Sequence, residues 1–365
     1  MNDSELVPII DWFDKIYSPC NTISDFMNKQ KQSILQKSTY TNLFPIEDDI
    51  FSEFHLSPSE MNLEIQIIPT ATWENLLLYT SSHVNLAGSG KSIRLAIKET
   101  NTNKFIGLIR LGSPVINFKP RNELLGKPIT DSSELITSFN DKVIMGFVIV
   151  PMQPFGYNYL GGKLLAGICC SHEIREIINN KYNTNICLFE TSSLYGTTKS
   201  ISQYDGMEPY IKFKGISESK FIPVPFNEDY EELKSLVDNI DKNIIVRSGT
   251  SMKLKSMNKI ISLVKNNIQN EYQKIKFNNI VTKAISLTEQ KRYYISTYGF
   301  KNSIDYILGN DDSLIKSENY DKFYLENIIN WWKIKATKRY QKLISENKLR
   351  NVVEIQTSEN LDNIR

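Results

Sequence analysis

The sequence has few of the residues that build metal sites or disulfide scaffolds. It contains four cysteines, Cys20, Cys169, Cys170 and Cys187, and no two of them form a C-x-x-C pair. This spacing argues against a zinc ribbon and against a fold held together by disulfides. The three histidines are too far apart in the sequence to predict a metal cluster. We therefore expect a reduced protein without a bound metal.

Long apolar segments and a strong net charge are also absent. No stretch approaches about 18 consecutive apolar residues, so the sequence predicts no transmembrane helix. The first ten residues, MNDSELVPII, are acidic and lack the pattern of a signal peptide, which favours a cytoplasmic location. The formal net charge of +2 points to no particular class of partner.

The length of the chain allows more than one domain. With 365 residues, of which 41% are hydrophobic, two domains and a terminal extension are expected. We expect a helical N-terminal extension at 1–60 and an α/β domain at 61–220. A basic and mostly helical C-terminal domain is expected at 221–350, followed by a flexible tail at 351–365.

The segment Lys142–Tyr195 is the best organised part of the chain. It contains an apolar strand, a glycine-bearing turn at Met152–Gly162, an amphipathic helix at Tyr159–Lys181 and a second apolar strand, NICLF. Upstream, Ser92–Lys98 and Lys104–Gly112 have strand patterns, and the ETNTN between them suits the tight turn of an antiparallel hairpin. This order predicts a mixed sheet with a helix packed on it.

The remaining segments have weaker patterns. We expect a loop at 114–139, a strand at 207–214, and helices at 227–239, 252–275 and 321–348, while 284–298 has no clear pattern. The segment AGSGKS at Ala87–Ser92 is not a phosphate loop, because Asn85 stands where that motif requires glycine and a strand pattern follows it.

The turn after the strand ending at Val150 has two interpretations. It is either an ordinary strand-to-helix connection, with Gly156 supplying a special backbone angle, or a cradle of backbone N–H groups for a phosphate. The first N–H groups of a helix lack partners, which favours anion binding at such a junction.

Two polar residues follow the second apolar strand. Glu190 ends that strand and Tyr195 lies five residues later, where a carboxylate and a phenol can serve in acid–base chemistry. The structural alternative is that Glu190 caps a turn and Tyr195 packs on the sheet.

The C-terminal helix has an aromatic side and a basic side. Its cations can bind nucleic-acid phosphates and its tryptophans can stack on bases, or the lysines form a solvated face over tryptophans docked on the core. The candidate phosphate-binding residues are Lys333, Lys335, Lys338, Arg339 and Lys342.

The stretch Leu76–Gly215 resembles the DruA-like domain, which is named after the Druantia anti-phage defence system and occurs in bacterial and phage proteins. The resemblance depends on the order of LLLYTSSHVNLAGSGKSIRLAIKETNTNKFIGLIRLGSP, VIMGFVIVPM, the following helix, ICLFETSS and MEPYIKFKG. It implies a protein of a phage, a mobile element or a defence system, located in the cytoplasm of a bacterial or phage-infected cell.

The same layout is similar to the GNAT N-acetyltransferase superfamily. That resemblance implies a central strand at VIMGFVIV, a pyrophosphate-binding turn at Gln153–Gly162, Glu190 at the end of the next strand, and Tyr195 as the proton donor. In GNAT-like sheets the two strands splay apart and the donor lies in the gap. Here Asn158 replaces the last glycine of the turn motif, and Pro154 removes one N–H from the cradle.

Together these patterns predict an α/β fold, a GNAT-like mixed sheet with flanking helices, plus a mostly helical C-terminal domain. The leading hypothesis is a DNA-associated group transferase that transfers an acyl or similar group from acetyl-CoA or another phosphate-bearing donor to a nucleic-acid base. The alternatives are a non-catalytic nucleic-acid-binding or defence-related module, favoured by Pro154 and Asn158, and a protein N-acetyltransferase. The expected donor-binding residues are Val150, Gln153, Gly156, Tyr157 and Asn158, with Glu190 and Tyr195 as catalytic residues.

Overall fold

The structure, a computed structural model, describes residues 2–37, 46–81, 90–116, 118–193, 202–217, 221–248, 251–288, 291–357 and 361. Their contacts group the chain into two compact units, one of Met1–Lys37 with Glu218–Gln290 and one of Ser38–Ser217 with Lys291–Asn363. Each unit combines separate segments of the chain, whereas the sequence-based domains are continuous, with boundaries at 60, 220 and 350. Those domain boundaries stay a prediction.

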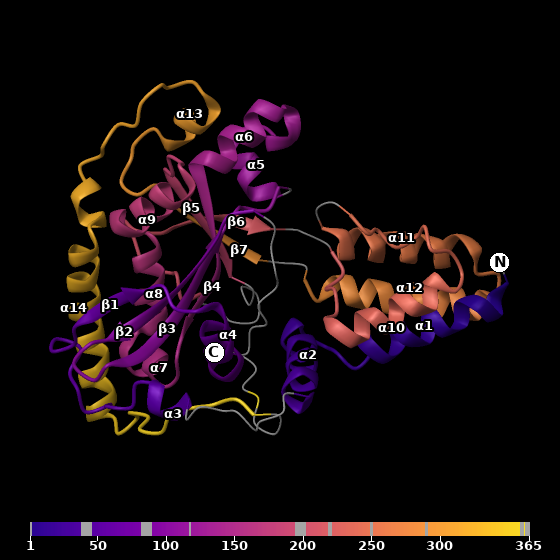
Figure 1. Cartoon of the computed structure of the whole chain (residues 1–365), viewed down its shortest axis with the longest axis horizontal. Coiled ribbons are helices and arrows are strands. Elements are labelled where there is room, and N and C mark those ends of the chain that lie inside the picture. Colours follow the sequence, from indigo (N-terminus) through magenta and orange to yellow (C-terminus); the bar gives the residue numbers. More distant parts are fainter. Residues whose placement is uncertain are drawn as a thin grey trace. The chain divides into compact units, whose positions relative to one another are not determined.

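The larger unit is built on a mixed sheet whose described strands lie in the order β1-β2-β3-β4-β5-β7-β6 (Figure 1). The pair β4–β5 is parallel, and the other neighbouring pairs are antiparallel. The expected hairpin is confirmed as β2–β3, and so is the mixed α/β fold with flanking helices. The strands are β1 (Leu63–Gln66), β2 (Ser92–Glu99), β3 (Lys104–Gly112), β4 (Val143–Pro151), β5 (Leu188–Ser193), β6 (Lys212–Ser217) and β7 (Lys291–Ser296).

Helices cover the sheet of this unit, with α8 and α14 on one side and α4 on the other (Figure 1). Its helices are α3 (Ile46–Asp49), α4 (Thr70–Thr80), α5 (Lys119–Leu125), α6 (Ser133–Lys142), α7 (Phe155–Tyr159), α8 (Gly161–Cys169), α9 (His172–Tyr182), α13 (Ser303–Leu308) and α14 (Leu325–Ser345). Two short 3₁₀ helices are η2 (Ile129–Asp131) and η3 (Tyr320–Phe323).

The expected long C-terminal helix is confirmed as α14. Its buried face packs against α7 and α8. Ile328, Trp332, Ala336 and Tyr340 recur every fourth residue and are buried, so they form one apolar stripe against α8 and α7. The Trp332 Nε1 donates to the Tyr159 carbonyl at 2.8 Å. None of the described helices is long and apolar enough to cross a membrane.

Two predicted segments are different in the structure. The prediction of a single helix at Tyr159–Lys181 is wrong, because the chain forms two helices, α8 and α9, with a break between them. At the break, the Ser171 hydroxyl accepts from the Ile174 N–H at 3.2 Å and caps the start of α9. The loop expected at 114–139 is also wrong, since it contains α5 and α6. Helix α5 ends at Gly126, which has the positive φ of +72° that a helix C-terminus favours.

Strand β7 comes from the segment at 284–298 whose pattern was unclear. It pairs with both β5 and β6 and therefore belongs to the sheet. The predicted strand at 207–214 begins later, as β6, and the predicted helix at 252–275 is divided between two helices of the smaller unit.

The described part of the smaller unit consists of helices from two segments of the chain, one within Met1–Lys37 and one within Glu218–Gln290. Phe13 packs on Phe277 with ring centroids 5.1 Å apart, Trp12 donates to the Asp229 carbonyl at 3.0 Å, and Tyr17 donates to the Pro223 carbonyl at 2.7 Å. The described helices are α1 (Asp3–Tyr17), α2 (Ile23–Lys37), α10 (Asn227–Asp238), α11 (Met252–Asn267) and α12 (Glu271–Ser286).

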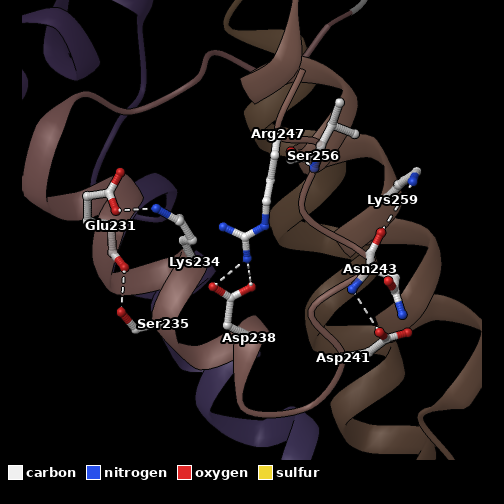
Figure 2. Close-up of polar contacts among 10 residues, drawn as sticks. Glu231, Lys234, Ser235, Asp238, Asp241, Asn243, Arg247, Ser256 and Lys259 are labelled. Atoms are coloured by element: carbon white, nitrogen blue, oxygen red, sulfur yellow. Dashed lines mark hydrogen bonds and ion pairs between the residues drawn. The ribbon is translucent and has the colours of Figure 1, made fainter. Parts of the chain in front are cut away.

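The connection between α10 and α11 is held by short-range polar contacts (Figure 2). Arg247 binds both carboxylate oxygens of Asp238, at 2.8 and 2.9 Å, and the Val246 N–H donates to the Ser256 hydroxyl at 2.9 Å. Half of the Arg247 side chain, 52%, remains exposed, so this ion pair is a surface contact.

Candidate functional site

A gap opens in the hydrogen-bonded pairing of β4 and β5. The parallel pairing runs from Val143 opposite Leu188 to Gly146 opposite Thr191, whereas β4 continues to Pro151. The Thr191 hydroxyl donates to the Gly146 carbonyl at 3.0 Å, where the paired part ends. The last residues of β4 therefore pair with β3 on one side and not with β5 on the other.

The side chain of Gln203 lies against the part of β4 that does not pair with β5. Its Nε2 is 3.5 Å from the Ile149 carbonyl oxygen of β4, and its Oε1 would be only 2.3 Å from a Cβ atom on Gly162, at the start of α8. Glycine at position 162 is thus required for the close approach of Gln203. The Lys163 ammonium donates to the carbonyl oxygens of Gln203, at 3.3 Å, and of Asp205.

Asp205 anchors the loop that carries Gln203. Its Oδ1 accepts from the Tyr294 hydroxyl at 2.8 Å and from Arg292 at 3.1 Å, and its Oδ2 accepts from the Ser202 N–H at 3.0 Å. Both side-chain donors belong to β7, so the loop is tied to the sheet beside the gap.

The predicted phosphate cradle forms α7 and uses its N–H groups internally. The Gly156 N–H donates to the Met152 carbonyl at 2.8 Å, the Asn158 N–H donates to the Pro154 carbonyl at 2.8 Å, and the Tyr157 N–H donates to the Gln153 Oε1 at 3.1 Å. These three amides of the predicted cradle therefore have protein partners.

The C-terminal segment covers the same turn. The Asn158 side chain is fully buried, donates to the Arg350 carbonyl at 2.7 Å and accepts from the Arg350 N–H at 3.2 Å. The Glu354 N–H donates to the Gln153 carbonyl at 3.0 Å. Asn158, which departs from the GNAT-like glycine pattern, thus has a structural use here, because it holds residues 350–354 on the turn.

Glu190 belongs to a fully buried polar cluster. Its Oε1 is 2.9 Å from the Arg121 Nη1 and its Oε2 accepts from the Tyr293 hydroxyl at 2.8 Å, and all three side chains are inaccessible. Arg121 also lies over the Phe139 ring, 4.5 Å from its centroid. The cluster joins α5, β5 and β7.

The surroundings of Glu190 oppose its use as an exposed acid or base. Burial raises the pKa of its carboxyl, while the Arg121 charge and the Tyr293 hydrogen bond act in the opposite direction. Both oxygens already have partners, so the geometry is that of a structural ion pair. Tyr195 lies outside the described residues, and its role as a proton donor stays a prediction.

The five candidate cations of α14 do not form one surface. Lys335, Lys338 and Lys342 are exposed and occur at i, i+3 and i+7, so they share a helix face. Lys333 points elsewhere and its ammonium is 3.3 Å from the Ser59 carbonyl oxygen. Arg339 is half-buried, with its guanidinium carbon 4.8 Å from the Tyr157 ring centroid.

Sequence reasoning missed Arg121, Tyr293 and Arg350. Arg121 lies in a segment expected to be a loop, although its Pro120 and Gly126 are helix start and stop signals. Tyr293 lies in a strand without a clear pattern, and Arg350 follows the end of α14. Among the described residues, no group of three or more His, Cys, Asp or Glu could hold a metal ion.

The family model of the Druantia protein DruA matches residues 22–205, just over half of the 365 residues. The chain belongs to the DruA family. A curated relative, the Druantia protein DruA of Escherichia coli (strain UMEA 4076-1), is 25% identical over 133 residues, which are 35% of this chain and 32% of the relative. The chain thus spans about a third of the curated relative it matches.

The DruA match includes only part of the site. It contains the β4–β5 gap, the α7 turn, Arg121 and Glu190, and it ends at Asp205. The partners supplied by β7, the α14 cations and Arg350 lie beyond the matched residues. In this DruA-family chain, the buried cluster therefore joins Arg121 and Glu190, inside the matched residues 22–205, to Tyr293, which lies beyond them.

We expect the substitution Glu190→Gln to lower the free energy of unfolding by about 3–5 kcal/mol, because it leaves the Arg121 charge buried and unpaired. The measurement is urea unfolding followed by circular dichroism. The matched control is Glu74→Gln, which breaks the partly exposed pair with Arg94 at 3.1 Å and should cost less than about 1 kcal/mol. Equal losses for the two variants would contradict a structural role for Glu190.

Proposed function

We propose that this chain is a nucleic-acid-binding component of an anti-phage defence system and that it binds through α14 rather than acting chemically at Glu190. Membership of the DruA family supports the defence role. The closed environment of Glu190 supports a binding role over an acid–base role at that residue, because neither carboxylate oxygen is open to a substrate.

The observation that carries this proposal is the exposed face of Lys335, Lys338 and Lys342. These residues span about 10 Å of helix, enough to contact more than one phosphate of a nucleic-acid strand. Only Lys342 has a carboxylate partner among the described residues, Glu346 at 3.6 Å, and 66% of the Lys342 side chain remains exposed. The charge of this face is therefore largely available to a polyanion.

Reversing the three charges tests the binding role. The combined substitution of Lys335, Lys338 and Lys342 by Glu should weaken DNA binding by about tenfold or more at low salt. It should also reduce the slope of log K against log salt by about 2, because each phosphate contact releases counterions. Fluorescence anisotropy with a labelled oligonucleotide at several salt concentrations measures both quantities.

The control changes the net charge equally at three exposed lysines on other elements, Lys127, Lys301 and Lys322. It should bind like the unmodified protein, apart from a small long-range effect. If both triple variants bind alike, the α14 face is not the interface, and the absence of any binding at low salt would remove the nucleic-acid proposal.

The gap between β4 and β5 favours a second candidate function. A GNAT-like transferase would place acetyl-CoA or another acyl donor there, with an amine of a nucleic-acid base or of a protein as acceptor. The end of the parallel pairing at Gly146 supports this candidate, whereas the Gln203 side chain against β4 and the hydrogen-bonded amides of α7 oppose donor binding in the conformation described.

Donor binding can be tested at Gln203. If the gap holds an acyl donor, the substitution Gln203→Ala should strengthen acetyl-CoA binding by about threefold or more, because no side chain then has to leave the gap. Isothermal titration calorimetry gives the two dissociation constants. An absence of heat for both proteins would remove the donor site, and the α14 proposal would be unaffected.

A further inference from the structure

Three aromatic and cationic side chains meet beside the α14 face. The guanidinium carbon of Arg350 lies 4.0 Å from the ring centroid of Tyr157, and that of Arg339 lies 4.8 Å from it. Cations at this distance are attracted by the electron-rich ring face, so Tyr157 holds both guanidinium groups in place.

Arg350 is further fixed by its backbone and by a carboxylate. Its N–H and carbonyl pair with the Asn158 side chain, and its Nη1 is 3.1 Å from the Glu354 Oε1. The side chain of Arg350 nevertheless remains 49% exposed. A planar cation is thus held in one orientation with a large part of its surface open to solvent.

The charge around this arrangement is positive. Glu346 raises the pKa of Lys348, and Tyr157 and Arg339 lie within electrostatic range of the same ammonium. Glu346 pairs with Lys348 at 2.8 Å and with Lys342 at 3.6 Å. Glu346 thus faces two ammonium groups, Arg350 pairs with Glu354, and Arg339 lies over Tyr157, so the cations around Tyr157 outnumber the carboxylates that these contacts supply.

We propose that Arg350, oriented by Tyr157, is a stacking site for an unpaired nucleotide base, so that this surface prefers single-stranded over double-stranded nucleic acid. The inference rests on the proposed nucleic-acid binding and names its substrate class. Guanidinium planes stack on exposed bases, and the bases of a single strand offer free faces that the interior bases of a duplex do not. The lysine face of α14 binds the phosphates of the same strand.

The decisive variant is Arg350→Lys, because it keeps the charge and removes the planar group. We expect it to weaken the binding of a 20-nucleotide single-stranded DNA by about five- to tenfold, the lower part of the range for the loss of one base stack. Binding of the corresponding duplex should change by less than about twofold. Anisotropy titrations with both probes at one salt concentration measure these effects.

The matched control is Arg247→Lys. Arg247 is exposed to a similar degree, 52%, and forms an ion pair with Asp238 (Figure 2). Arg350 likewise forms an ion pair, with Glu354. This control should bind both probes like the unmodified protein. A second variant, Tyr157→Ala, should reproduce the selective loss of single-strand binding, and its thermal unfolding curve verifies that it is folded.

The possible outcomes separate the two proposals. Loss of single-strand binding in Arg350→Lys, with duplex binding kept, supports the stacking site. Equal effects on both probes, or no effect on either, overturn it, while the charge-reversed α14 variant still decides whether the protein binds nucleic acid through the lysine face. If the unmodified protein binds neither probe, both proposals fail.

Discussion

The buried ion pair between Arg121 and Glu190, completed by the Tyr293 hydroxyl, joins three elements that are far apart in the sequence. Two charges taken out of water require close and well-directed partners, and here the carboxylate has one on each oxygen. The contact fixes α5 against β5 and β7, and β7 in turn supplies Arg292 and Tyr294, which anchor Asp205 in the loop that carries Gln203. The arrangement of the gap thus depends indirectly on the same cluster.

The fold was largely predictable because the strands and most helices have clear periodicity. The β2–β3 hairpin, β4, β5 and α14 follow directly from apolar alternation or from a spacing of four, which is a local property of the sequence. Strand β7 was not predictable in this way, since its place between β5 and β6 is set by pairing across distant parts of the chain. The break at Ser171 is a capping effect that a continuous apolar pattern conceals.

The candidate site was less predictable, because the type of a residue does not determine which distant side chain it will pair with in the fold. The sequence pattern placed Glu190 at the end of an apolar strand, but β5 runs from Leu188 to Ser193 and Glu190 lies inside it. Its role depends on Arg121, 69 residues earlier. Asn158 and Pro154 reduced the similarity to a phosphate-binding turn, and the structure gives Asn158 a use in holding the Arg350 backbone. The exposed α14 cations were identified from the sequence, but only the helix geometry separates Lys333 from the lysine face.

The account depends most on Glu190 being a structural partner of Arg121 rather than a free catalytic group. A double-mutant cycle of urea unfolding with Arg121→Met and Glu190→Leu tests this claim directly. The account predicts that each single variant is strongly destabilised and that the double variant loses clearly less than the sum, because neither charge is then left unpaired. Losses that simply add would show that the two side chains are not coupled and would contradict the account.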